Sequence, residues 1–123
     1  MKRLLDSVIL IDHLNSVSAA TEYLGKIETA QTSISVITRA EILTGVKKNV
    51  STVKLLLDQF ILLGIDREIA DRAAELRQTH RWKLPDAFQA ALAIRYGIEF
   101  VTRNTKDFGE DRHTFVKIPY RVI

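Results

Sequence analysis

The sequence alternates short apolar segments with longer segments whose apolar residues recur at helical spacing. We expect strands at 3–6, 32–36, 98–102 and 114–118, and helices at 7–14, 19–27, 38–46, 50–62, 66–82 and 85–96. Apolar strands joined by helical crossovers are typical of a parallel sheet with both faces covered. The pattern therefore predicts an α/β fold, a three-layer α/β/α sandwich around a parallel sheet.

Composition limits the chemistry and the surroundings of the chain. Its length of 123 residues suits a single domain spanning 1–123. It has no cysteine and only three scattered histidines, which excludes disulfides and disfavours zinc. The apolar stretches are far too short to span a membrane, so we expect a cytoplasmic protein. The net charge of +3 is weak support for a polyanionic partner.

An ionisable side chain, Asp6, interrupts the first apolar run. Burying an unpaired carboxylate is costly, so this group needs a compensating partner or access to solvent. Asp6 is expected at the carboxyl end of the first strand, and polar sites of parallel sheets gather at such ends. We therefore expect Asp6 to face a functional crevice.

Further acids fall where strands end or helices begin, and each also has a purely structural interpretation. Asp6 is placed to cap the following helix, Glu41 has capping-box spacing, and the helix dipole favours Asp86 in a first turn. Turn chemistry alone explains Asn104 and Asp107. Taken singly, none of these residues indicates a function.

Taken together, the acids indicate a metal site. Two carboxylates about 5 Å apart repel by roughly 3 kcal/mol at an effective dielectric of 20. Several converging acids would offset much of the ~5–15 kcal/mol that stabilises a domain, and a divalent cation removes this objection. Oxygen ligands suit Mg²⁺ or Mn²⁺. Sequestering four acids leaves 18 basic against 11 acidic side chains, a surface of +7 that suits a nuclease.

Four motifs in this order resemble the PIN-domain ribonucleases, and among them the VapC-like toxins of type II toxin–antitoxin systems. They are Leu-Leu-Asp-Ser-Val-Ile-Leu-Ile-Asp-His-Leu at 4–14, Ile-Ser-Val-Ile-Thr-Arg-Ala-Glu-Ile-Leu-Thr-Gly at 34–45, Pro-Asp-Ala-Phe-Gln-Ala-Ala-Leu-Ala at 85–93 and Phe-Val-Thr-Arg-Asn-Thr-Lys-Asp-Phe at 100–108. The resemblance covers essentially the whole chain. It implies a parallel sheet of about five strands and Mg²⁺- or Mn²⁺-dependent cleavage of RNA by metal-activated water.

The resemblance also assigns roles to the acids. Asp6, Glu41 and Asp86 fall on the metal-binding acids of the family. Asp107 is taken as the fourth catalytic carboxylate. Asn104 stands where many members carry an acid, so it is a ligand or a water-positioning residue, and one or two metals remain open.

Other residues of the motifs receive supporting roles. Ser7 keeps a hydroxyl beside the site and Thr102 lies at a strand end within reach of it, whereas Asp12 is treated as structural or peripheral. Contacts to RNA phosphates are expected from the basic side chains that flank the acid motifs. An equal alternative is that these are ordinary solvated side chains of the surface. These bases are Arg39, Arg103 and Lys106.

The resemblance implies an RNA substrate, a VapB-like antitoxin and a homodimer. The helices within 19–46 or 50–62 either form an apolar groove for the antitoxin or only pack on the sheet. Two alternatives keep the fold: a housekeeping RNA-processing nuclease without antitoxin, and a non-catalytic module that binds RNA or protein. A signalling receiver domain is disfavoured because Ser7 and Val8, rather than an acid, follow Asp6.

Overall fold

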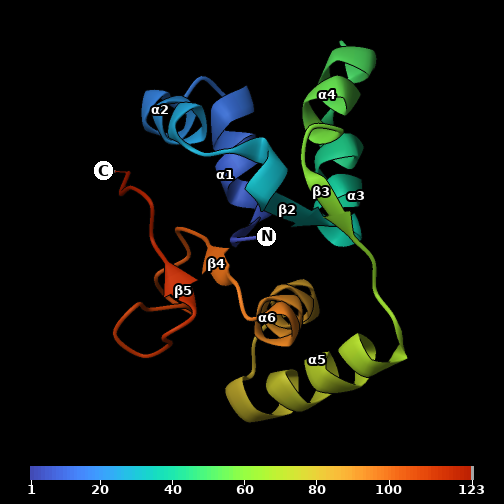
Figure 1. Cartoon of the computed structure of the whole chain (residues 1–123), viewed down its shortest axis with the longest axis vertical. Helices are drawn as coiled ribbons and strands as arrows, with labels where there is room; N and C mark the ends of the chain where they lie inside the picture. Colours follow the sequence, from blue (N-terminus) through green and yellow to red (C-terminus); the bar gives the residue numbers. More distant parts are fainter. Residues whose placement is uncertain (123) are drawn as a thin grey trace.

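A parallel sheet forms the centre of the computed structural model, which describes residues 1–122 (Figure 1). Its strands are β1 (Arg3–Leu5), β2 (Thr32–Ser35), β3 (Ile61–Leu63), β4 (Glu99–Val101) and β5 (Val116–Lys117). All neighbours pair in parallel in the order β3-β2-β1-β4-β5. The first strand therefore lies in the middle, with its carboxyl end between those of β2 and β4.

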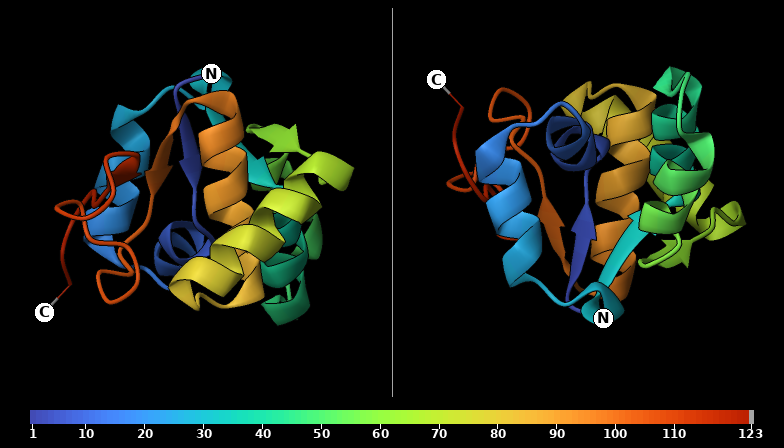
Figure 2. Two further views of the ribbon diagram at one scale, coloured as in Figure 1. Left: turned by 90° about the horizontal axis from the view of Figure 1, so that it is seen from below. Right: turned by 90° about the horizontal axis from the view of Figure 1, so that it is seen from above.

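Helices cover both faces of this sheet. They are α1 (Ser7–Leu14), α2 (Ser18–Lys26), α3 (Val36–Gly45), α4 (Val50–Leu57), α5 (Arg67–His80) and α6 (Leu84–Tyr96), with a 3-10 turn η1 (Thr29–Gln31) before β2. The pair α5 and α6 packs on one face and α1 to α4 on the other (Figures 1 and 2). The predicted three-layer α/β sandwich with a parallel sheet is confirmed.

Alternation along the strands produces a separate core on each face. Side chains of adjacent strand residues point to opposite faces, so Leu4 enters the core under α5 and α6 while Leu5 enters the core under α1 to α4. The α6 side of the first core is built from small residues, and their size lets α5 pack closely on α6. These residues are Ala87, Ala90, Ala91 and Ala93.

One predicted element is wrong. The expected helix at 50–62 ends at Leu57, and Ile61–Leu63 forms the edge strand β3 instead. A short apolar run fits helical and strand periodicity equally well. Here the backbone of β3 pairs with β2, with Ile61 opposite Ser33, so tertiary pairing decides the conformation. The other expected elements are present with shifts of one or two residues at their ends.

Among residues 1–122 the structure holds no helix of the length and apolar character needed to cross a bilayer.

A buried carboxylate, Asp12, ties three parts of the chain together. Arg103, just beyond β4, donates from Nε and Nη2 to both Asp12 oxygens at 2.6 and 2.9 Å. The hydroxyl of Tyr120, in the C-terminal segment, donates to Asp12 Oδ2 at 2.8 Å. The Arg103 bond, ahead of the bond from Tyr120, holds the pKa of Asp12 below its ordinary value although burial opposes this. The structural role expected for Asp12 is therefore consistent with these contacts.

We expect Asp12→Asn to lower the free energy of unfolding by about 1–3 kcal/mol, because it removes a charge-assisted pair. Tyr120→Phe removes one hydrogen bond and should cost about 1 kcal/mol. Because the pKa of Asp12 is lowered by folding, this stability is present at neutral pH and is lost as the pH falls below about 4. Urea denaturation at pH 7 and pH 3 measures both effects. Equal stability of Asp12→Asn and wild type at pH 7 would contradict the prediction.

Candidate active site

Asp6 is held at the carboxyl end of β1 by its neighbours in the sheet. Its backbone N–H donates to the carbonyl of Val101 at 2.8 Å. Its Oδ1 accepts from the backbone N–H of Ser7 at 2.8 Å, so Asp6 caps α1, and its Oδ2 accepts from the Thr102 hydroxyl at 2.7 Å. The side chain thus combines the capping position and the strand-end position that the sequence predicts.

Burial makes the charge on Asp6 unfavourable. The residue is only 8% exposed, and this burial raises the pKa of its carboxyl. The hydrogen bonds from Thr102 and Ser7 lower that pKa, and the charge of Glu41 raises it again. A nearby cation or a bound proton would therefore stabilise the Asp6 carboxyl group.

A second carboxylate, Asp86, stands in the first turn of α6 directly after Pro85. Burial raises the pKa of Asp86 to about 6, and the negative charges of Asp6 and Asp107 add to the rise. Lys83, just before the helix, opposes the shift. The fold thus brings α6 close enough to β1 and to the loop after β4 for their acids to repel one another.

A third acid, Glu41, lies on α3 close enough for the charge of Asp86 to affect it. Partial burial is the main cause that raises the pKa of its carboxyl, and the charge of Asp86 is the next. The purely structural alternative for Glu41, a capping box with Thr38, does not form, because Ser35 is the N-cap of α3 and accepts from the backbone N–H of Thr38 at 3.0 Å. Glu41 therefore lies beyond the first helical turn and is not used as a cap.

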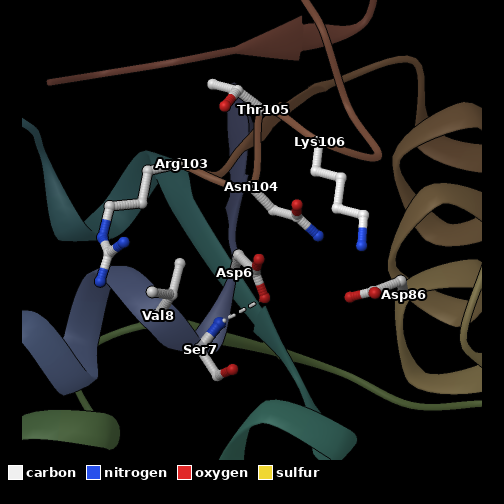
Figure 3. Close-up of a pocket in the computed structure, with 8 residues that line it drawn as sticks. All are labelled: Asp6, Ser7, Val8, Asp86, Arg103, Asn104, Thr105 and Lys106. Atoms are coloured by element: carbon white, nitrogen blue, oxygen red, sulfur yellow. Dashed lines mark hydrogen bonds between the residues drawn. The ribbon is translucent and has the colours of Figure 1, made fainter. Parts of the chain in front are cut away.

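A cavity of about 430 Å³ opens over Asp6 and Asp86 (Figure 3), whereas Glu41 lines a separate groove between α1 and α3. Asp6 and Asp86 lie on its wall, and Lys106 and Asn104 extend toward them from the loop after β4. Its full lining is Asp6, Ser7, Val8, Asp86, Arg103, Asn104, Thr105 and Lys106. Acids from β1 and α6 thus share one opening with two bases.

Asp107 is not part of this lining, but it forms hydrogen bonds with Asn104. Asn104 Nδ2 donates to Asp107 Oδ2 at 3.1 Å, and the Asp107 backbone N–H donates to Asn104 Oδ1 at 3.3 Å. The Asn104 backbone N–H donates to the Thr102 hydroxyl oxygen at 3.1 Å. A chain of hydrogen bonds therefore connects Asp6 through Thr102 to Asn104 and Asp107.

The bases expected to contact RNA have different surroundings. Lys106 is exposed and lines the cavity. Arg103 lines the cavity as well, but Asp12 binds it. Arg39 pairs with Asp58 at 2.8 Å and is not in the lining. Of these bases, Lys106 has the surroundings that best suit a phosphate contact.

The donor set fits a hard divalent cation in its chemistry. Asp6, Asp86 and Glu41 offer oxygen donors, and the charges of these residues raise one another's pKa, a repulsion that a cation would relieve. Within residues 1–122 no group of three or more acidic, histidine or cysteine side chains is placed as a metal-ligand cluster. A cation here would therefore have few protein ligands and would keep several waters.

Some residues of this site were not expected from the sequence. Lys83 influences Asp86, and its position immediately before the helix start is the signal that could have found it. Val8 and Thr105 line the cavity without bearing any distinctive chemistry. Nothing in the sequence around them indicates that they line a cavity.

Comparison with protein-family models identifies the family of the chain. The family model described as PIN domain matches residues 3–110. The chain belongs to the PIN-domain family. This confirms the family that the four motifs indicate. A comparison with curated proteins finds no match.

Solved structures agree with this family in fold. A chain of a toxin–antitoxin complex from Klebsiella pneumoniae is 36% identical, with a TM-score of 0.90, 98% of this PIN domain covered and 100% of that chain. FitAcB from Neisseria gonorrhoeae is 22% identical, with a TM-score of 0.78 and coverage of 98% and 99%. VapBC2 from Rickettsia felis, bound to a DNA fragment from its promoter, is 21% identical, with a TM-score of 0.77 and coverage of 95% and 98%. The 36% identical match comes from a toxin–antitoxin complex and so supports the resemblance to VapC-like toxins, while the other two matches show the fold.

In metal-free protein at pH 7 we expect Asp86→Asn to be more stable than wild type by about 1–2 kcal/mol, because it removes a charge that its surroundings disfavour. The folded protein holds a proton on Asp86 up to about pH 6, whereas the unfolded chain releases it near the ordinary aspartate pKa of 3.8. Wild type therefore loses stability relative to Asp86→Asn as the pH rises through this window.

Urea denaturation in EDTA from pH 4 to pH 7 measures this difference. Asp71→Asn, which changes an exposed aspartate of α5, is the matched control and should follow wild type. A variant that is less stable than wild type at pH 7 would show that Asp86 is not under repulsion.

Proposed function

We propose that this PIN domain is a Mg²⁺- or Mn²⁺-dependent endoribonuclease and the toxin of a type II toxin–antitoxin pair that acts in the cytoplasm. The observation that supports this most strongly is that Asp6 and Asp86 line one cavity, where burial and the charges of Asp6 and Asp107 raise the pKa of Asp86. Carboxylates held together against their repulsion at a cavity are suited to cation binding. A structural role alone gives no reason for this repulsion.

Asp6 and Asp86 would hold the cation, with Glu41 directly or through water. When bound, a divalent cation lowers the pKa of water and stabilises negative charge on a phosphate under attack. The chain contributes the orientation of its carboxylates. Thr102 and the Ser7 backbone fix both oxygens of Asp6, so its carboxylate is already in place before any substrate arrives.

The loop after β4 would position the RNA. Lys106 is exposed beside the acids and can neutralise a phosphate oxygen of the bound strand. Asn104, fixed by Asp107, presents an amide to the same cavity and can orient a water or a phosphate by hydrogen bonding. Asp107 then acts mainly by holding Asn104 and by adding negative charge near Asp86.

The proposed partner is a VapB-like antitoxin. The relative from Klebsiella pneumoniae with 36% identity was solved as a toxin–antitoxin complex and matches along its whole length. The groove between α1 and α3 is one candidate contact surface, since its lining is largely apolar and includes Glu41. Its lining residues are Ile11, Leu14, Asn15, Glu41, Ile42, Gly45 and Val46. A homodimer is part of the same proposal.

We expect wild type, freed of antitoxin, to cut RNA at discrete positions in Mn²⁺ or Mg²⁺ and to leave it intact in EDTA. Asp86→Asn removes a proposed ligand and should lower the rate on the order of 100-fold or more. The measurement is incubation with total RNA followed by mapping of the cleaved ends. Asp71→Asn, which keeps the same charge change away from the cavity, should cut like wild type. Full metal-dependent activity of Asp86→Asn would contradict the proposal.

Lys106→Ala should raise KM for RNA about 3- to 10-fold at low salt with little change in kcat, because the lysine contributes one phosphate contact. The salt dependence of KM should become shallower by about one charge. Lys54→Ala, which changes an exposed base of α4 outside the cavity lining, is the control. Steady-state kinetics across a salt series gives both quantities, and an unchanged salt slope for Lys106→Ala would exclude the contact.

A further inference from the structure

A buried amide, Gln89, lies on α6 one helical turn after Asp86. It is 1% exposed, and its Nε2 donates to the Thr38 hydroxyl oxygen. Its Oε1 is buried and has no hydrogen-bond partner among residues 1–122. A buried polar atom without a partner is destabilising, and an apolar side chain of the same length would avoid this cost. Packing alone therefore does not explain why this position carries an amide side chain.

The partner of Gln89 has a matching place in the other layer. Thr38 lies on α3 one turn before Glu41, and it is fully buried. The Thr38 oxygen also accepts from the Ser35 hydroxyl at 3.3 Å, at the end of β2. Since Leu4 pairs with Ser33, Ser35 is level with Asp6 in the sheet. The hydrogen bond from Gln89 to Thr38 thus lies at the carboxyl ends of the strands, where the acids also lie.

This bond joins helices from opposite layers. The core contacts of α6 lie on one face of the sheet and those of α3 on the other, so the two helices make little direct contact with each other. Both supply an acid to the site, and the charge of Asp86 raises the pKa of Glu41. Repulsion between these acids favours separation of α3 and α6, and the Gln89–Thr38 bond opposes it.

We propose that Gln89 and Thr38 are positioning residues that hold the Asp86 and Glu41 carboxylates at the separation that a divalent cation requires. The inference rests on the proposed function insofar as that function uses a cation at these acids. A hydrogen bond one turn from each acid fixes the two helix starts relative to each other, in the way that residues behind metal ligands orient them. The unpartnered oxygen of Gln89 is then the stability cost of a link that an apolar residue could not make.

The variant Gln89→Met keeps the length of the side chain and removes both the bond and the unpartnered oxygen. We expect its melting temperature in EDTA to equal or exceed that of wild type, while its affinity for Mn²⁺ falls about 10-fold or more. Thr38→Val removes the same bond from the other side and should give the same loss. Thr38→Ser keeps the hydroxyl and should restore most of the affinity.

Isothermal titration of the EDTA-treated full chain with Mn²⁺, well below the melting temperature, measures these affinities. Asp66→Ala removes the N-cap of α5, whose carboxylate accepts from the Ile69 N–H at 2.9 Å, and serves as a destabilised control away from the acids. It should bind Mn²⁺ like wild type. A simple structural role for Gln89 predicts the reverse, with affinity following stability.

The outcomes separate this inference from the proposed function. If Gln89→Met and Thr38→Val bind Mn²⁺ within twofold of wild type, the inference is wrong, whether or not the wild type cuts RNA. If both variants lose affinity but wild type cuts no RNA, the positioning role stands and the nuclease proposal fails. If wild type binds no Mn²⁺, both this inference and the metal dependence in the proposed function are wrong.

Discussion

Repulsion between carboxylates at the carboxyl edge of the sheet is the constraint that the rest of this structure must oppose. Asp6 is fixed at the end of β1, while Asp86 arrives from α6 in one layer and Glu41 from α3 in the other. Each helix is anchored by its own apolar core, so the acids cannot separate without disturbing packing. Repulsion at this end of the sheet therefore opposes folding, and the proposed cation would relieve it.

Hydrogen bonds and an ion pair near the acids also fix the start of the loop after β4. Thr102 donates to Asp6 and accepts from Asn104, so one hydroxyl joins the end of β1 to the start of the loop. On the far side of the loop start, Asp12 binds Arg103. Both anchors limit the freedom of the segment that carries Lys106. A loop held in this way can present its base at a constant position over the acids.

Local patterns were sufficient to predict the layers and to expect Asp6 and Asp86 at the same end of the sheet. Strand ends and helix starts are legible in the sequence, which is why Asp6 and Asp86 could be expected at the same edge. Pairings between distant residues could not be read, because nothing near Arg103 shows that Asp12, 91 positions away, will bind it. The same holds for Gln89 and Thr38, 51 positions apart. The strand β3 was missed because its partner, not its own periodicity, decides its conformation.

Thermal unfolding of the EDTA-treated protein with and without Mn²⁺ tests most directly whether the repelling acids bind a cation. A ligand present at 100 times its Kd stabilises the native state by about 2.7 kcal/mol, which for a chain of this size raises the melting temperature by several degrees. We expect that rise for wild type and a much smaller one for Asp6→Asn. An unchanged melting temperature of wild type in excess Mn²⁺ would contradict the account.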